Sequence, residues 1–271
     1  MTEATEELEV ALLLEALFQR HGFDFRAYDR PGVKRKLQHL MRERGLPTVS
    51  LLQNAVLHED GAACHVLRRL SVQPIPLFDD PEQARLLRIA VTCLHASPVP
   101  RVWLPDCAGA EGAWSLAILL AEERLHRRTE IFATVATEEM LAEAQDATIP
   151  VERIQEYQES YLKSGGLGRL SDYFDIRGKR ATLIASLRER ITWSQYNLVT
   201  DASPNEFQMI VCQRALPDFG PALRQRVLQL FHGSLSLFGV LGIDRPFDAT
   251  TPLAASYQPL FPSAPWYKRV A

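Results

Sequence analysis

A short turn-like segment, DCAGAEG, begins at Asp106 and combines acidic with small residues. It follows the apolar run 101–104 and precedes an apolar, helix-like segment over 112–123. In an open parallel sheet, ligands bind at the carboxyl ends of the strands, where a small-residue turn lets the backbone approach a cofactor. The segment therefore predicts a nucleotide-cofactor site, although its turn has only Gly109 and lacks the G-x-G-x-x-G set.

A second concentration of functional side chains lies between positions 20 and 46. Eight basic and three acidic residues give this segment a local net charge of +5. Arg30, Lys34, Arg35 and Arg42 are its candidate partner-binding residues. Such a helical face is either simply solvated or attracts an acidic partner, and it also suits the phosphates of a nucleotide second messenger or of RNA. The sequence leaves these alternatives open.

The composition excludes several classes of protein. The chain has 271 residues, with 30 Lys and Arg against 33 Asp and Glu, so its net charge of −3 provides no overall field for DNA, and we expect no DNA partner. Four scattered cysteines without a C-x-x-C pair favour a reducing compartment and no metal site. No apolar run approaches the roughly 18 residues that span a bilayer, and the acidic N-terminus is unlike a signal peptide. We therefore expect a cytoplasmic protein without membrane insertion.

The elements that would position these side chains fall into two groups. Apolar residues at helical spacing predict an all-α domain over 1–70, with one helix at Pro31–Arg44. After a proline-marked linker over 71–81, short apolar strands alternate with helices, which predicts an α/β domain with a parallel sheet over 82–271. Glycines and an alternating segment predict a small β insertion at about 165–190.

Six segments occur in one order along the chain: GFDFRAYDRPGVKRKLQHLMRERGL, LFDDPE, DCAGAEGAWSLAILLAE, IFATVATEEMLAEA, YNL and FQMIVCQRALPDF. In order and spacing they resemble the CheR-type chemoreceptor methyltransferases. The resemblance implies a Rossmann-like S-adenosylmethionine (SAM) methyltransferase domain with a small β-subdomain, preceded by an all-α domain. Family members methylate glutamate side chains of chemoreceptor signalling domains. The implied cofactor is SAM or its product S-adenosylhomocysteine (SAH), and the implied partner is such a signalling domain or another signalling protein.

The resemblance assigns roles to single positions before the first strand. The family's Thr and Arg, which lie near the SAM carboxylate and the incoming glutamate, are replaced by Ile75 and Asp79. A carboxylate in place of the Arg repels both groups, by about 4 kcal/mol at a separation of about 4 Å and an effective dielectric constant near 20. We also expect Asp79 to cap a helix that begins at Pro81.

In the small-residue turn, the family's first and inner glycines are replaced by Asp106 and Ala110, and Gly109 is offset by one position. A residue with a Cβ at a positive-φ position is strained and blocks close approach of a ligand to the backbone. Glu111 is retained, and the resemblance implies that this carboxylate faces the amino group of the cofactor. The turn therefore keeps one functional group of the family and loses its glycines.

Beyond the second strand, Val135 stands where the family has an acid that accepts hydrogen bonds from the ribose hydroxyls. Leaving these hydroxyls without partners costs about 1–3 kcal/mol each. Glu138 either replaces that acid or is simply a first-turn helix acid. Asn197 and Leu198 retain the family's Asn-Leu, which meets the adenine edge.

In the fourth-strand motif, the family's Arg-Asn and Tyr are replaced by Gln213, Arg214 and Asp218. In the family, the tyrosine lies beside the transferring methyl group. The family's catalytic positions are therefore held by Ile75, Asp79 and Asp218, and none of them keeps the family's residue. These substitutions spare the scaffold and predict a protein with weak or no SAM binding that acts through partners, in the manner of a pseudoenzyme.

Two alternatives stay open. One is an active SAM-dependent protein-glutamate O-methyltransferase; the other is a remodelled pocket in which Asp79, Asp106 and Glu111 favour a cationic ligand. The resemblance also implies that the basic helix docks acidic receptor helices. The β insertion, with its basic turn at 177–180, stands where some family members capture a receptor peptide as an added strand.

Overall fold

The computed structural model describes residues 3–202, 206–247 and 251–271. The chain divides into two compact units, Met1–Gln73 with Arg214–Val227, and Pro74–Gln213 with Leu228–Ala271. The predicted division at a linker over 71–81 stays a prediction. The structure adds that the segment Arg214–Val227 groups with the N-terminal helices.

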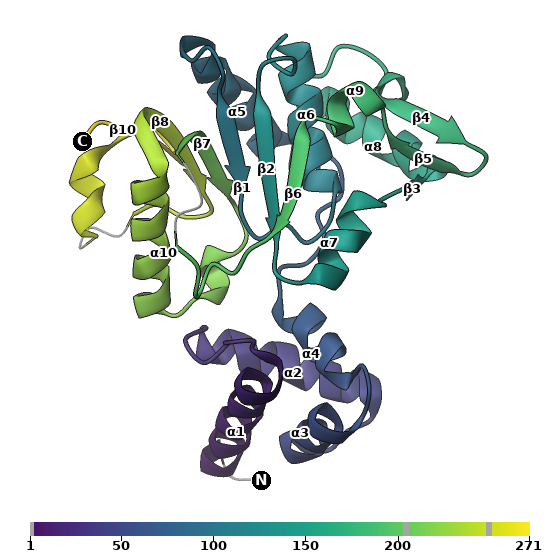
Figure 1. The fold of residues 1–271 in the computed structure, drawn as a ribbon, viewed down its shortest axis with the longest axis vertical. Coiled ribbons are helices and arrows are strands. Elements are labelled where there is room, and N and C mark those ends of the chain that lie inside the picture. Colours follow the sequence, from purple (N-terminus) through teal and green to yellow (C-terminus); the bar gives the residue numbers. More distant parts are fainter. Residues whose placement is uncertain (1–2, 203–205, 248–250) are drawn as a thin grey trace. The chain divides into compact units, whose positions relative to one another are not determined.

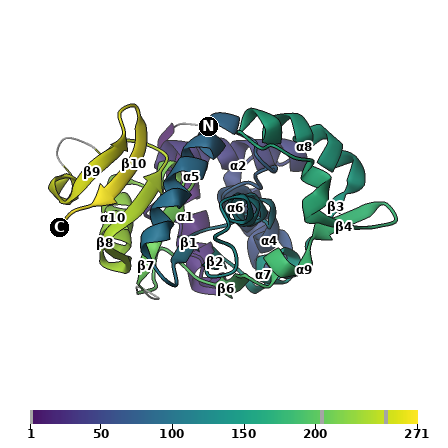
Figure 2. The same cartoon turned by 90° about the horizontal axis from the view of Figure 1, so that it is seen from above.

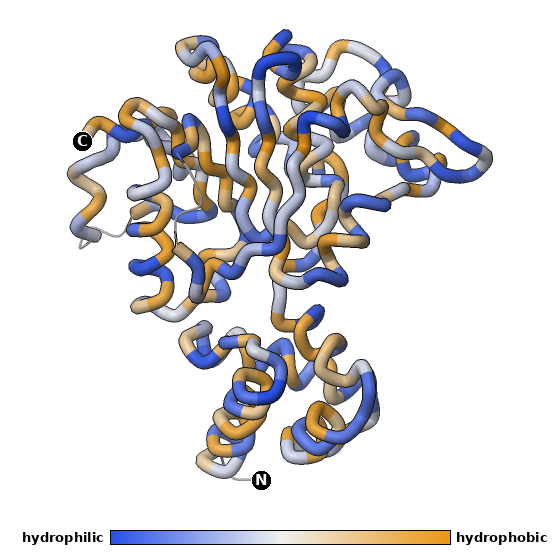
Figure 3. The backbone as a smooth tube through the Cα atoms, in the orientation of Figure 1, coloured by the Kyte–Doolittle hydropathy of each residue, from blue (hydrophilic) through white to orange (hydrophobic). Residues whose placement is uncertain are grey.

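The first unit is helical. Leu13 and Leu17 of its first helix pack with Leu37 and Leu52 in a common hydrophobic core. Hydrophobic and hydrophilic residues alternate along this first helix, as expected for an amphipathic helix on a core (Figure 3). The unit contains α1 (Glu3–His21), α2 (Arg30–Arg44), α3 (Val49–His58), α4 (Ala62–Leu70), the 3-10 helix η3 (Leu216–Asp218) and the first part of α10 (Pro221–Ser234).

Local sequence signals fix the ends of α2. Asp29 is the N-cap of α2: its side chain accepts a hydrogen bond from the Gly32 amide at 2.9 Å. Gly45 ends the helix in a left-handed conformation with φ of 66°, which glycine adopts without steric cost. The two caps set the ends of α2, the helix that carries most of the basic residues of the segment over 20–46.

The second unit is built on a seven-stranded sheet, within the described residues (Figure 1). Its strand order is β6 (Ile191–Gln195), β2 (Glu130–Val135), β1 (Arg101–Leu104), β7 (Phe207–Cys212), β8 (Leu235–Ile243), β10 (Ala264–Arg269) and β9 (Tyr257–Phe261). The first five strands are parallel to one another, and β10 pairs antiparallel with both β8 and β9. Further elements of this unit are α5 (Pro81–Val91), η1 (Thr92–Ala96), α6 (Glu111–Glu122), α7 (Glu138–Gln145) and η4 (Pro252–Ser256).

Both faces of the central strand β1 are buried, which explains its unbroken apolar run. Val102 packs into the same core as Trp114 of α6. Trp103, which points to the other face, makes an edge contact with Phe231 of α10 at 5.5 Å between ring centroids. Helices on both faces of a parallel sheet require this pattern. The predicted α/β class with a preceding all-α part is confirmed.

A small subdomain carries a three-stranded sheet with the order β3 (Ile149–Pro150), β5 (Arg180–Leu183) and β4 (Phe174–Arg177). Figure 2 shows this subdomain at one end of the second unit and β9 and β10 at the other. The hairpin β4–β5 lies inside the predicted insertion, whereas β3 precedes it and is separated from it by a helix that the sequence analysis missed. The connecting elements are α8 (Val151–Lys163), η2 (Leu170–Tyr173) and α9 (Ala185–Arg188).

Candidate functional site

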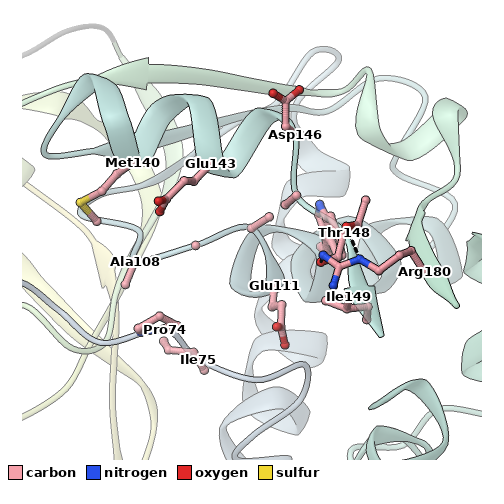
Figure 4. A pocket seen from close by; sticks show the side chains of 14 residues that line it. Pro74, Ile75, Ala108, Glu111, Met140, Glu143, Asp146, Thr148, Ile149 and Arg180 are labelled. Carbon is pink, nitrogen blue, oxygen red and sulfur yellow. Dashed lines mark hydrogen bonds between the residues drawn. The ribbon is translucent and has the colours of Figure 1, made fainter. Parts of the chain in front are cut away.

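A cavity of about 390 Å³ lies at the amino-terminal end of α6, where the turn after β1 meets α7 and β3. Figure 4 shows Met140 and Glu143 projecting from α7, with Pro74 and Ile75 across from them. Of the predicted cofactor and catalytic positions, Ile75, Gly109 and Glu111 line this cavity.

Glu111 is the functional group that the fold positions most firmly. As the first residue of α6, it stands at the end of the helix where backbone N–H groups favour a negative charge. Its Oε2 accepts a hydrogen bond from the Leu77 amide at 3.1 Å, and its Oε1 accepts one from Arg153 Nη1 at 3.4 Å. Its side chain is only 18% exposed. Both carboxylate oxygens therefore already have donors within the chain.

Burial acts on the titration of this group. Desolvation raises the pKa of Glu111 above its ordinary value, whereas Tyr157, Arg153 and the Leu77 amide lower it. Burial, together with the nearby Glu111 carboxylate, raises the pKa of Tyr157 to about 12, so this phenol stays protonated at neutral pH. Of this pair, Glu111 lines the cavity and Tyr157 does not.

Ile75, which lines the cavity, lies in the loop before α5. Leu77 and Phe78 are buried, and the Phe78 amide donates to Ser115 Oγ at 3.3 Å, which fastens the loop to α6. Phe78 adopts a φ of 54°, a left-handed conformation that is costly for an aromatic residue. Asp79 follows on the exposed side and is not among the residues that line the cavity.

The predicted capping role of Asp79 is wrong. Asp80 is the N-cap of α5, because its Oδ1 accepts hydrogen bonds from the amides of Glu82 at 3.0 Å and Gln83 at 3.1 Å. The two aspartates are adjacent and both precede Pro81, so residue type alone did not distinguish them. The cap is the residue whose side chain reaches back to the second and third amides of the helix.

The turn after β1 holds Asp106 at a φ of 53°, in the left-handed region. Aspartate tolerates this conformation better than most side chains but worse than glycine. The Cys107 amide donates to the Thr134 carbonyl oxygen at 2.7 Å and so joins the turn to β2. Burial, reinforced by Asp106, raises the pKa of the Cys107 thiol to about 12, which keeps it a neutral packing group. A Cβ added at Gly109 would meet only Pro74, at an ordinary 3.9 Å.

The predicted ribose position provides no polar group. Val135 is the last residue of β2, is fully buried, and accepts a backbone hydrogen bond from Tyr196 at 2.9 Å. Glu138 is exposed in the first turn of α7, where Thr137 is the N-cap. Neither Val135 nor Glu138 is among the cavity-lining residues.

The remaining predicted cofactor positions make contacts within the chain. Asn197 Oδ1 accepts a hydrogen bond from the Val199 amide at 2.9 Å, Leu198 is buried, and Gln213 Nε2 donates to Gln83 at 3.1 Å. Asn197, Leu198 and Gln213 are also absent from the cavity lining, so their role toward a cofactor stays a prediction.

Asp218 belongs to the helical unit. Its Oδ2 pairs with Lys36 Nζ at 2.6 Å, and the same ammonium group donates to the Leu70 carbonyl oxygen at 3.0 Å. The Asp218 carbonyl oxygen accepts a hydrogen bond from the Asp29 amide at 2.8 Å, and Phe219 makes an edge contact with the Tyr28 ring. The residue that replaces the family's tyrosine is therefore an anchor for the segment that carries it.

The four candidate partner-binding residues differ in their surroundings. Arg30 and Lys34 both pair with Glu7 of α1, at 3.1 and 2.5 Å. The hydrogen bond from Lys34 lowers the pKa of Glu7, which keeps that carboxylate charged. Arg35 and Arg42 are exposed, and Arg42 donates to the Gln38 carbonyl oxygen. The acids of α1, which the sequence analysis did not connect with the basic helix, neutralise part of its charge.

Sequence reasoning missed several lining residues from α7 and the small sheet. Met140 and Glu143 lie three residues apart on one face of α7, and this spacing was available as a signal. Arg180 reaches the cavity from β5, and its guanidinium donates to Thr148 Oγ1 at 2.7 Å and to the Thr148 carbonyl oxygen at 2.8 Å (Figure 4). Its position depends on the pairing of β5 with β3, which no local pattern reveals.

Two kinds of feature are absent from the residues that the structure describes. No helix in 3–202, 206–247 and 251–271 is long and apolar enough to cross a membrane. In the same ranges, no group of three or more His, Cys, Asp or Glu side chains is arranged to hold a metal ion.

Comparison with known proteins assigns both parts of the chain. Residues 8–71 match the family described as CheR methyltransferase, all-alpha domain, and residues 78–245 match CheR methyltransferase, SAM binding domain. A Pseudomonas putida protein named putative methyltransferase Cher3 is 34% identical over 241 residues, which cover 89% of this chain and 88% of that protein. A chemotaxis protein methyltransferase of Listeria innocua is 27% identical over 143 residues, 53% of this chain and 52% of that protein.

A solved structure also resembles this chain. An O-methyltransferase family protein from Burkholderia thailandensis is 14% identical, with a TM-score of 0.39. The match covers 83% of this chain and 57% of that one, so this chain spans little more than half of that protein's length.

Proposed function

Because this chain belongs to the CheR methyltransferase family, we propose that it acts in bacterial chemosensory signalling by binding a partner, with weak or no binding of SAM. The chain keeps the two-part architecture of the family. Most side chains that would recognise the cofactor are substituted. Partner recognition depends instead on the exposed basic residues of α2.

The buried Val135 carries this proposal. A methyltransferase that retains SAM needs an acceptor for the ribose hydroxyls at the end of the second strand, and a fully buried valine offers none. The loss of such hydrogen bonds costs about 1–3 kcal/mol for each group left without a partner. Asp79 and the left-handed Asp106 act in the same direction, since each places a carboxylate where the resemblance implies a cation or a glycine.

The partner surface that we propose is the exposed side of α2. Arg35 and Arg42 are seven residues apart and therefore lie on one face of this helix, and both are exposed. Two arginines at this spacing suit acidic side chains along a helical chemoreceptor signalling domain. Arg30 and Lys34 contribute less, because both already pair with Glu7.

Binding to a receptor signalling domain without SAM tests this proposal. We expect Arg35→Glu with Arg42→Glu to weaken binding at least about tenfold, which corresponds to 1.4 kcal/mol. Binding should also fall as salt rises, because exposed charges are screened. Arg169→Glu, at a side chain that is 81% exposed on the other unit, is the matched control and should leave binding unchanged. Equal effects of both changes would contradict a specific role for α2.

A second candidate is an active protein-glutamate O-methyltransferase. The retention of Glu111 beside the cavity favours it, as does the 34% identity to a protein named putative methyltransferase. Transfer of a radiolabelled methyl group from SAM to receptor signalling domains would support this candidate. The absence of transfer across several receptors would count against it.

A third candidate is a cationic small ligand in the cavity. Glu143 and Asp146 of the α7 region line it together with Glu111, against one lining cation, Arg180, among the described residues. Calorimetric titration with amines and with SAM, on the wild type and on Glu143→Gln, distinguishes this candidate. An amine that loses affinity in the variant would favour it.

A further inference from the structure

Glu111 already holds a cation from its own chain. Arg153, on α8, places Nη1 3.4 Å from Glu111 Oε1, while the Leu77 amide takes Oε2. We propose that Arg153 is an internal counter-cation that occupies the amine position at Glu111 and so disfavours ligands that bring their own ammonium group there. This inference rests on the proposed function, in which Glu111 is the retained group of a weakened SAM site.

The surroundings of Glu111 and Arg153 fit a competition between the Arg153 guanidinium and a ligand ammonium group. Glu111 is largely buried and lines the cavity, whereas Arg153 is 48% exposed and is not among the lining residues. The guanidinium lies over the Tyr157 ring, 5.9 Å from its centroid, which is within reach of a weak cation–π attraction. A ligand ammonium must therefore displace Arg153 toward solvent or share one carboxylate with it, and both options lower affinity.

The inference makes a distinction among ligands. SAM and SAH each carry an α-amino acid end with an ammonium group, whereas 5′-methylthioadenosine has the same nucleoside without that end. Competition at Glu111 penalises the first two compounds only, because an unfavourable contact with one chemical group acts as a specificity element. Arg153 would then be a residue that sets ligand preference, and not a catalytic residue.

Calorimetric titration of the full chain with these three compounds tests the inference. Arg153→Met keeps an aliphatic stem over Tyr157 and removes the charge. We expect it to tighten the binding of SAM and SAH about tenfold, which is 1.4 kcal/mol, and to leave 5′-methylthioadenosine unchanged. Lys163→Met, at an exposed lysine on the same helix, is the matched control and should change none of the three affinities. With Glu111→Gln present, Arg153→Met should give no gain.

Several outcomes would overturn the inference. An equal gain in affinity for all three compounds would mean that Arg153 acts generally, through charge or folding. A loss of SAM affinity in Arg153→Met would mean that Arg153 binds the carboxylate of the ligand. No detectable SAM binding to Arg153→Met would also overturn it. Arg153→Gln, checked by thermal melting, repeats the test if Arg153→Met does not fold. A low-micromolar Kd of the wild type for SAM would instead contradict the proposed function. The two tests are separate, because the inference depends only on the ratio of the Kd values of Arg153→Met and the wild type.

Discussion

At the scale of single residues, the proposal of a weakened cofactor site depends on a few side chains in and near the cavity. Glu111, Ile75 and Gly109 line the cavity. Val135 is buried and apolar, and Asp79 is exposed beside the loop that leads to the cavity. Under the proposed function, the substitutions fall on side chains that would recognise charge or hydroxyl groups of the cofactor.

Restoring two of these groups should restore affinity. We expect Val135→Asp with Asp79→Arg to raise SAM affinity at least about tenfold, because an acceptor for the ribose and a cation for the carboxylate are regained. Val135→Asn with Asp79→Met is the matched control, with side chains of comparable length and no new charges, and should give a smaller gain. A folded Asp-Arg variant without any gain in calorimetry would mean that other positions limit binding.

The residue scale also shows what a sequence can predict. Glu111 lines the cavity, whereas the role toward a cofactor that family resemblance implies for it stays a prediction. Sequence reasoning did not distinguish Asp79 from Asp80 as a cap, since that depends on which side chain reaches the helix amides. It missed Arg153 altogether, although Ile154, Tyr157 and Tyr161 have the spacing of a buried helix face and would have predicted α8.

At the scale of elements, α8 is held on the second unit by a buried polar group. Tyr161 is fully buried, and its hydroxyl donates to Glu122 of α6. Glu122 also pairs with Arg88 of α5 at 2.7 Å, and Arg88 donates to the Ser164 carbonyl oxygen at 3.2 Å. Because α8 carries Arg153, these contacts also position the counter-cation of the site.

The glycine after α8 should be essential to this packing. A Cβ at Gly166 would lie 2.3 Å from Tyr161 Cζ, far inside van der Waals contact. We expect Gly166→Ala to lower the free energy of unfolding by about 1–3 kcal/mol, as overpacking of a filled core does. The measurement is urea denaturation followed by circular dichroism.

Gly112→Ala provides the control, since a Cβ there meets nothing within 4 Å and the residue lies in α6. It should be neutral or stabilise by up to about 1 kcal/mol, because alanine favours the helix. Similar midpoints for Gly166→Ala and the wild type would show that the Tyr161 ring moves freely and that α8 is loosely held.

At the scale of the whole molecule, the balance of charge depends on pairs far apart in the sequence. The basic segment over 20–46 was predicted from its composition, but its partners were not. Glu7 pairs with both Arg30 and Lys34 from another helix, and Asp218 pairs with Lys36 across 182 positions. Such long-range pairs are set by tertiary packing, so no local pattern predicts them.

The Lys36–Asp218 pair should contribute measurably to stability. Both side chains are 22% exposed, and Lys36 also donates to Leu70. In a double-mutant cycle with Lys36→Met and Asp218→Asn, we expect a coupling free energy of about 1 kcal/mol. The Lys163–Glu159 pair, whose side chains are 61% and 76% exposed, should give a coupling near zero. Equal couplings would mean that Asp218 does not anchor its segment.

The central claim is that a CheR-family scaffold has been kept while its cofactor site has been weakened. Calorimetric titration of the purified full chain with SAM tests it most directly. The account predicts no saturable heat at micromolar SAM concentrations, with a gain in the Val135→Asp, Asp79→Arg variant. A wild-type Kd in the low-micromolar range would contradict it and favour an active methyltransferase.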